Sequence, residues 1–332
     1  MLDKSQKQVM AKEQKTSVDI MKFITGEYLQ KFGILLALLI MCIALSIMSP
    51  YFLKVSNFVN ILLQSSINAI LAFGLTFVII TGGIDLSVGS VLALAGVVMG
   101  VVLQNQGNVV IAIFLGLIVG ALCGFGNGVL ITKLNLPPFI ATLGMMSIAR
   151  GLALVITKGY PISGLPPAVR FLGADKLVGI PVPVLLVIIL FVISHIILSN
   201  TKIGRYDFAI GGNEEATKLS GVNVNKYKII IYTISGLFAG IAGIVLAARV
   251  NSALAIAGMG YELDAIAASV IGGVSLMGGE GSAPGTLLGA VVMGVLRNGL
   301  NLLNVSTFWQ QVVIGVVVIA AVSLDQLQKK RR

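Results

Sequence analysis

The stretch VVIAIFLGLIVGALCGFGNGVLI, residues 109–131, contains no charged side chain. An α-helix of about 20 apolar residues crosses the hydrocarbon core of a bilayer, which is roughly 30 Å thick. Strands of a membrane barrel would instead alternate apolar and polar residues, and this run is continuous. The glycines at 116, 120, 124 and 128 recur every four positions, so we expect one face of this helix to pack closely against another helix.

The rest of the chain has the same character. Of its 332 residues, 57% are hydrophobic and only 11% are charged, whereas soluble domains carry about 25% charged residues. In lipid, every backbone polar group must find its partner within the protein, which restricts spanning segments to helices and closed barrels. We therefore predict an all-α fold, a polytopic transmembrane helical bundle.

Ten apolar runs of roughly helical length follow one another along the chain. The predicted spans are 32–49, 58–81, 86–103, 109–131, 138–157, 183–199, 228–248, 262–277, 284–303 and 308–324. The eighth is the weakest, because Glu262 and Asp264 lie at its start. The transmembrane domain thus occupies 32–324 and includes a hydrophilic loop at 200–227, with a polar arm at 1–31 and a basic tail at 325–332.

The distribution of basic residues predicts the orientation. Lysine and arginine concentrate in the cytoplasmic loops of membrane proteins. With the amino terminus inside, 16 of the 23 basic residues fall in inner segments and five in outer segments. We expect both termini to be cytoplasmic, and we attribute the net charge of +10 to this topology and to contact with membrane lipid. No soluble basic cluster indicates a nucleic-acid partner.

Motifs for catalysis are missing from the sequence. It contains no GxxxxGK[ST] phosphate loop, no HExxH motif and a single histidine, His195. Cys42 and Cys123 both lie inside apolar runs, without metal-ligand spacing. We therefore predict that the chain is not an enzyme and binds neither a cofactor nor a metal.

Carboxylates near the spans form the first candidate functional group. Asp85 lies in the break GGIDLSVGS, residues 82–90, and an ionisable group at membrane depth is a candidate for function. A capping role is the alternative, in which Asp85 and Ser87 accept from free N–H groups at the start of the third span. Glu262 and Asp264 are either favourable first-turn acids or contacts for polar substrate or a partner. The candidate pathway or gating residues are Gly82, Gly83, Asp85, Ser87, Glu262 and Asp264.

The glycine-rich break has a weak internal echo. Residues 82–100 read GGIDLSVGSVLALAGVVMG and residues 278–294 read GGEGSAPGTLLGAVVMG. Transporters are often built from repeats whose broken helices meet near the membrane midplane. Glycine-rich apolar sequence also matches itself by chance, so a true repeat and a coincidence both remain open.

The hydrophilic loop contains a short amphipathic segment from Asn213 to Ser220. Asn213 is suited to cap a helix there, and Glu214 and Glu215 follow in the first turn. Ala216 and Leu219 share one face. Because such a short helix is marginal in water on its own, docking into a partner would order it; a solvated loop helix is the alternative.

Four strings in the sequence resemble the ribose-type sugar permease subunit of bacterial ATP-binding-cassette (ABC) importers. They are TFVIITGGIDLSVGS, GRYDFAIGGNEEATKLSGVNVNKYKIIIY, GYELDAIAASVIGGVSLMGGEGSAPGTLLGA and NGLNLLNVSTFWQQV. The resemblance covers roughly residues 45–325. It implies that 213–221 is the coupling helix that docks into the ATPase, with the residues Asn213, Glu214, Glu215, Ala216, Leu219, Ser220 and Gly221.

The resemblance also implies the partners. They are a second copy of the permease or a paralogous permease, a cytoplasmic ABC ATPase with two cassettes, and a periplasmic or lipid-tethered sugar-binding protein. The expected location is the bacterial cytoplasmic (inner) membrane, and ribose is the expected sugar, with xylose, allose and galactose-type sugars as alternatives. Two other classes stay open: an ion-coupled secondary transporter, with Asp85 or Glu262 at the bilayer centre, and a passive channel.

Overall fold

A computed structural model describes residues 33–330 of the chain. The predicted amino-terminal arm, 1–31, and the last two residues of the predicted tail lie outside the described residues. After a helix at Gly33–Met48, the helices are α2 (Val55–Ile80), α3 (Val88–Gln104), α4 (Val109–Lys133), α5 (Pro138–Thr157), α6 (Pro167–Ala174), α7 (Val182–Asn200), α8 (Lys202–Gly212), α9 (Glu214–Leu219), α10 (Val224–Val250), α11 (Tyr261–Ile271), α12 (Ala283–Leu302) and α13 (Thr307–Lys330).

Strands are minor elements. In the described residues there are two antiparallel pairs of two-residue strands: β1 (Ile162–Ser163) with β4 (Ser252–Ala253), and β2 (Lys176–Leu177) with β3 (Ile180–Pro181). The predicted all-α class is therefore confirmed. Five helices are long and apolar enough to cross a membrane, namely α2, α4, α5, α7 and α10, and three shorter apolar helices lie at Gly33–Met48, Val88–Gln104 and Thr307–Ser323.

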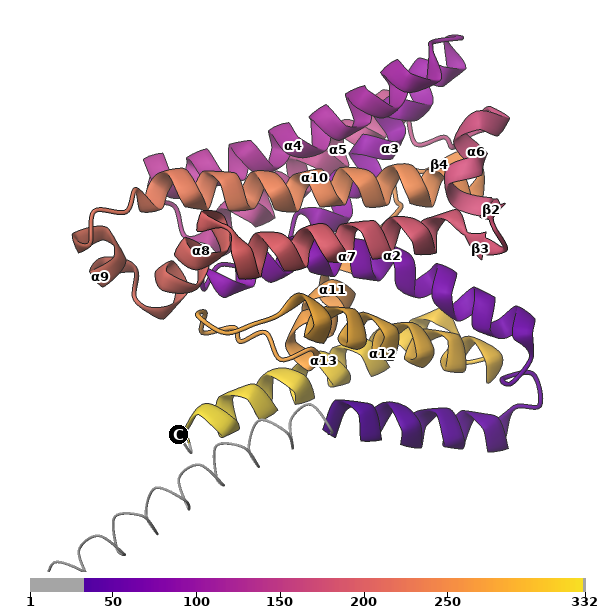
Figure 1. Ribbon diagram of the computed structural model, residues 1–332. Coiled ribbons are helices and arrows are strands. Elements are labelled where there is room, and N and C mark those ends of the chain that lie inside the picture. The colour runs from indigo at the N-terminus through magenta and orange to yellow at the C-terminus, as the bar shows by residue number, and fades with distance from the viewer. Residues whose placement is uncertain (1–32, 331–332) are drawn as a thin grey trace, which may run out of the picture.

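The long helices lie side by side in a bundle with α2 at its centre (Figure 1). Every residue from Ser65 to Ile80 is buried, because α7, α10, α11 and α12 all pack against α2. The outer helices α4, α5 and α7 expose large apolar side chains such as Phe114, Val155 and Ile189. In a membrane protein these exposed apolar side chains suit a lipid environment.

Helices α4 and α10 make the most extensive helix pair of the bundle. A Cβ atom on Gly124 would lie 2.1 Å from the carbonyl oxygen of Tyr232, closer than any side chain can approach. The glycine face predicted for residues 116–128 is therefore confirmed as a packing surface, since only hydrogen atoms fit between the two backbones there.

The two ends of the bundle differ. Helices α8 and α9 lie together at one end, whereas α6 and the β2–β3 hairpin lie at the opposite end (Figure 1). The loops at 81–87 and 272–282 approach the α8–α9 end, where the N–H of Gly279 donates to the carbonyl of Ile80 at 2.8 Å. We call these the α8–α9 end and the α6 end below.

One predicted span is wrong in extent. The eighth was expected over 262–277, but α11 ends at Ile271, and at 1.5 Å per residue such a helix covers about 17 Å, well short of the hydrocarbon core. The helix stops at Gly272 and Gly273, and Gly273 has a φ of +88° that favours glycine. The tenth predicted span, in contrast, continues as helix to Lys330, into the predicted tail.

Candidate functional site

Helix α3 begins inside the bundle. Its first residues follow Asp85, whose carboxylate accepts from the hydroxyl of Ser235 at 2.9 Å, and Ser235 lies near the middle of α10. The extended residues before α3 therefore lie at the depth of the middle of a long apolar helix. Irregular backbone at such depth needs partners from the protein, because lipid offers none.

Those partners form a buried polar cluster around Asp85. One carboxylate oxygen of Asp85 accepts from the backbone N–H of Ser87 at 2.9 Å and from its hydroxyl at 2.6 Å. The side-chain amide of Asn127 in α4 donates to the Ser87 hydroxyl at 3.0 Å. Thr142 in α5 donates to the carbonyl of Ile84 at 3.3 Å. Side chains of α4, α5 and α10 thus hold this segment in place.

The capping alternative for this segment is correct in part. Asp85 does accept an N–H just before α3, but the Ser87 hydroxyl donates to Asp85 and makes no cap bond to the helix. Asp85 is 1% exposed. Gly82 and Gly83 form the turn before the segment, and Gly82 has a φ of +77°. The structure therefore brings Gly82, Gly83, Asp85 and Ser87 together at the start of α3.

Helix α11 also begins inside the bundle. The chain enters from β4 at the α6 end and runs along α3, so that Gly258 reaches Gly89 near the start of α3. A Cβ atom on Gly89 would lie 2.3 Å from the carbonyl oxygen of Gly258. The amino ends of α3 and α11 are thus neighbours, which is the arrangement of discontinuous helices found in many transporters.

The two acids of α11 have different partners. Glu262 accepts from the backbone N–H of Gly260 at 3.2 Å and is attracted to the charge of Arg150 in α5. Asp264 is fully buried and forms an ion pair with Arg297 of α12. Both residues do lie in the first turn of α11, as predicted. The structure places Glu262 close to Gly89 and so near the start of α3, whereas Asp264 faces α12.

A cavity of about 200 Å³ lies between α3, α10 and the segment that leads to α11. Its lining is mostly apolar or glycine and includes Leu92, Gly96, Gly243, Ala257, Gly258 and Tyr261. Backbone groups and the side chains of Ser252 and Tyr261 are the polar groups of the lining residues. Such a lining suits weak contact with a polar solute better than tight binding.

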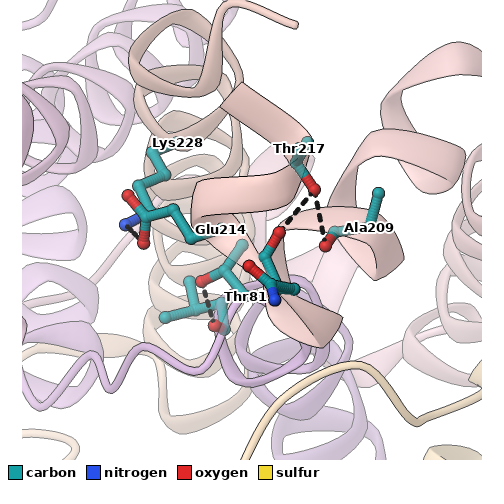
Figure 2. A network of polar contacts seen from close by, with 7 residues as sticks. Thr81, Ala209, Glu214, Thr217 and Lys228 are labelled. Atoms are coloured by element: carbon teal, nitrogen blue, oxygen red, sulfur yellow. Dashed lines mark hydrogen bonds and ion pairs between the residues drawn. The ribbon is translucent and has the colours of Figure 1, made fainter. Parts of the chain in front are cut away.

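The α8–α9 end carries the predicted coupling residues. Helix α9 begins after Asn213, whose side chain accepts from the N–H of Ala216 at 2.8 Å, and Glu214 and Glu215 occupy the first turn. Figure 2 shows the Thr217 hydroxyl donating to the carbonyl of Ala209 in α8, at 2.8 Å. The cap predicted for Asn213 is confirmed, and Thr217 fastens the short helix to its neighbour.

The outer face of α9 is unoccupied by the described part of the chain. Ala216 and Leu219 are exposed, Leu219 at 84%, while Glu214 forms an ion pair of 2.6 Å with Lys228 at the start of α10 (Figure 2). Ser220 donates to the carbonyl of Ala216 at 2.9 Å, and Gly221 follows with a φ of +83°. The helix therefore presents an apolar side chain on a rigidly attached turn.

Sequence reasoning missed several polar residues of these sites. No role was predicted from the sequence for Arg150, Arg297, Ser235, Asn127 or Thr142. Asp207 of α8 was also missed: it is fully buried, neither carboxylate oxygen has a hydrogen-bond partner among the described residues, and burial raises the pKa of its carboxyl well above the usual value. No short-range pattern indicates these residues, because most of their contacts are with distant segments.

Comparison with known proteins identifies relatives over almost the whole chain. The family model described as branched-chain amino acid transport system / permease component matches residues 57–322. The ribose import permease protein RbsC of Bacillus subtilis (strain 168) is 49% identical over 90% of this chain and 93% of its own length. RbsC of Escherichia coli (strain K12) is 46% identical over 92% and 96%.

More distant relatives include the D-allose transport system permease protein AlsC of Escherichia coli (strain K12), which is 39% identical over 90% of this chain and 93% of its own. No solved structure matches significantly. The resemblance to ribose-type permeases is confirmed by these identities. The chain belongs to the family of transport-system permease components described for branched-chain amino acid transport.

Proposed function

We propose that this chain is the membrane-spanning permease subunit of a bacterial ABC importer for ribose, located in the cytoplasmic (inner) membrane. The observation that carries the proposal is the 49% identity to a ribose import permease over 90% of this chain. The allose and arabinose permeases among the relatives, each 39% identical, support the alternative sugars less strongly.

The proposed topology has about ten spans and both termini in the cytoplasm, with residues 32–324 as the permease domain. Although α11 is too short to cross alone, the extended residues from β4, α11 itself and the 272–282 loop together lead from the α6 end to the α8–α9 end. Together they therefore count as one membrane crossing. The number of crossings stays even, and both termini remain on the same side of the membrane. The arm at 1–31 and the tail at 325–332 belong to the cytoplasmic side in this proposal.

In the proposed mechanism the ATPase and the sugar-binding protein are separate chains, and ATP is hydrolysed on the ATPase. Helix α9 with the residues of 213–221 is the coupling helix. Two observations support this role: Leu219 is exposed, and Thr217 bonds the helix to α8. A coupling helix must be held in place by the permease, because otherwise motion of the ATPase would not be transmitted to the other helices. The second permease chain is a copy of this one or a paralogue.

The pathway residues in this proposal are Gly82, Gly83, Asp85 and Ser87 before α3, with Glu262 and Asp264 in the first turn of α11; Glu262 lies near the start of α3 and Asp264 faces α12. Apolar side chains and glycines form most of the lining of the neighbouring cavity. The permease then contributes a weakly binding conduit while the binding protein selects the sugar. High-affinity binding of ribose to the purified permease alone, measured by calorimetry, would contradict this division of labour.

An ion-coupled secondary transporter is the second candidate, and the depth of Asp85 favours it. Its carboxylate, however, already accepts three hydrogen bonds from Ser87 and Ser235, which leaves few lone pairs for an ion. The two candidates differ in what drives uptake. Uptake of labelled ribose into proteoliposomes is measured with and without an imposed proton or sodium gradient, and with and without ATP. Uptake by an importer depends on ATP and not on either gradient, whereas uptake by a secondary transporter depends on a gradient.

The choice of sugar is tested in the same vesicles. Unlabelled ribose, allose, arabinose and xylose are added in excess during uptake of labelled ribose, in the presence of the cognate binding protein. The proposal expects ribose to compete most strongly. If another sugar competes more strongly, that sugar is the substrate and ribose is not, while the proposed importer mechanism still holds.

A further inference from the structure

The chain between β4 and α11 contains a segment at 254–260 that has little regular structure of its own. We call it the gate segment. Within it, the N–H of Ala257 donates to the carbonyl of Leu254 at 3.1 Å, and the carbonyls of Ala255 and Ala257 accept from a single side-chain nitrogen, Nη1 of Arg150. The second of these bonds measures 2.7 Å.

Arg150 reaches the gate segment from α5, far away in the sequence and in a helix that packs on α3 and α4. A backbone carbonyl inside a membrane protein is destabilising when it is left without a donor, because lipid offers none. One guanidinium satisfies two such carbonyls, and the nearby carboxylate of Glu262 attracts its charge. Arg150 is therefore the principal side-chain attachment of this segment to α5.

The gate segment separates two spaces. Leu254, Ala257 and Gly258 line the cavity of about 200 Å³, whereas Ile256 and Met259 are exposed, at 61% and 65%, away from the segment's buried residues. The segment is a run of turns that contributes both to the lining of the cavity beside α3 and α10 and to the surface of the chain, and in this sense it is a wall of the cavity.

The wall has flexible points at its carboxyl end. Gly258 and Gly260 have φ values of +69° and +81°, and glycine changes between such conformations and ordinary ones with little steric penalty. A wall that one arginine attaches to α5, that packs on Gly89 of α3 and that has two glycines at its carboxyl end has the features of a loop that opens and closes over a site.

We propose that Arg150 is a positioning residue that holds the gate segment closed over the cavity, so that release of its two carbonyls opens the cavity for the solute. The inference rests on the proposed function, because a gate has a use only in a transport pathway. It assigns a role to a residue outside the predicted pathway set.

The chain offers a matched control. Arg249 of α10 also donates from Nη1 to a backbone carbonyl, that of Leu63, at 3.1 Å, but this carbonyl lies in α2. Arg249→Gln therefore removes a similar half-buried arginine and a similar bond without removing a hydrogen bond to the gate segment, although the charge of Arg249 also acts on Tyr261, just beyond that segment. Arg150→Lys keeps the charge and a donor and should restore part of the effect of Arg150→Gln.

The first test is amide hydrogen exchange, followed by mass spectrometry, on the full-length permease in lipid nanodiscs. We expect Arg150→Gln to speed exchange of peptides covering 254–260 at least tenfold, with α2 and α4 peptides unchanged. Arg150→Lys should lie in between, and Arg249→Gln should match the wild type in these peptides. Unchanged exchange at 254–260 in Arg150→Gln, or faster exchange throughout the protein, would overturn the proposal.

The second test measures leakage. Proteoliposomes that contain the complete transporter are formed around labelled ribose and then diluted without ATP. We expect efflux at least fivefold faster with Arg150→Gln than with the wild type, and no change with Arg249→Gln. A residue that only supports the fold would lower the amount of assembled transporter and would not raise efflux per transporter. Equal efflux from Arg150→Gln and wild type would contradict the gate.

The two proposals fail in different ways. If the wild-type complex does not accumulate ribose with ATP, the proposed function is wrong, but the exchange experiment still decides whether Arg150 holds the segment. If uptake by the wild type is ATP-dependent while Arg150→Gln neither loosens the segment nor leaks, the gate is wrong and the importer stands.

Discussion

The carboxylate of Asp85 accepts a hydrogen bond of 2.9 Å from the hydroxyl of Ser235, although the two residues are 150 positions apart. This bond joins the extended start of α3 to the middle of α10. Both side chains are 1% exposed, so water does not replace the bond if one partner is removed. Together with the bonds from Asn127 and Thr142, this long-range contact fixes the start of a discontinuous helix.

Ser235→Ala should lower the thermal stability of the purified permease. Loss of a donor to a buried carboxylate costs about 1–3 kcal/mol, which corresponds to a fall in Tm on the order of 1–4 °C for a chain of this size. Ser194→Ala is the control, because the Ser194 hydroxyl is buried and has no partner among the described residues. Equal shifts for the two variants, measured by intrinsic fluorescence in detergent, would show that the Asp85 bond does not matter.

Removal of Arg297 should be more damaging than removal of its partner. Arg297→Gln leaves the fully buried carboxylate of Asp264 without its ion pair, and breaking a buried pair in this way costs about 3–5 kcal/mol.

Asp264→Asn introduced into the Arg297→Gln protein should recover part of the lost Tm, because it removes the unpaired charge. The double variant is compared with both single variants by the same thermal assay. If the double variant is as unstable as the sum of the single changes, Asp264 and Arg297 do not act as a pair.

Gly124→Ala should disturb the α4–α10 contact, since the new methyl group would lie 2.1 Å from the carbonyl oxygen of Tyr232. Gly144→Ala in α5 is the matched control: a Cβ there meets nothing within 4 Å, and alanine favours helix over glycine by about 1 kcal/mol. We expect a clear loss of Tm and of folded yield for Gly124→Ala, and a neutral or slightly raised Tm for Gly144→Ala. The reverse order would contradict the packing assigned to this face.

Local sequence predicts most of the helices of this fold. The fifth span was predicted at 138–157 and α5 occupies Pro138–Thr157, because proline begins a helix readily and Lys158 and Gly159, both at positive φ, end it. The cap at Asn213 was predictable for the same reason: it depends on residues three or four apart.

The depth of the sites was not predictable. Local sequence does not distinguish a helix that starts in the middle of the bundle from one that starts at its surface. The segment 84–87 is distinguished by its bonds from Ser235, Asn127 and Thr142, each distant in the sequence. Likewise, the predicted eighth span is apolar enough to continue, but the glycines from Gly272 onward adopt turns that pack against other segments. The two stretches of the internal echo each contain a turn and then a helix, and the turns touch through Gly82 and Gly278; whether they are a true repeat is still a hypothesis.

Leu219→Asp should weaken binding of the ATPase while insertion into the membrane continues. The side chain is 84% exposed at the α8–α9 end, so the change has little effect on the fold itself, but a charge there opposes docking in an apolar pocket. Leu177→Asp, at an exposed leucine of the α6 end, is the control. Pull-down of the ATPase from solubilised membranes should fall at least fivefold for Leu219→Asp alone; equal recovery with both variants would remove α9 from the coupling contact.

The central claim is that this chain is the membrane permease for ribose, and that the ATPase that drives transport and the binding protein that selects the sugar are separate proteins. The most direct measurement is uptake of labelled ribose into proteoliposomes that contain the permease, with the ATPase, the binding protein and ATP omitted in turn. The account predicts accumulation only when all three are present with the permease. Accumulation that persists without the ATPase or without the binding protein would contradict it.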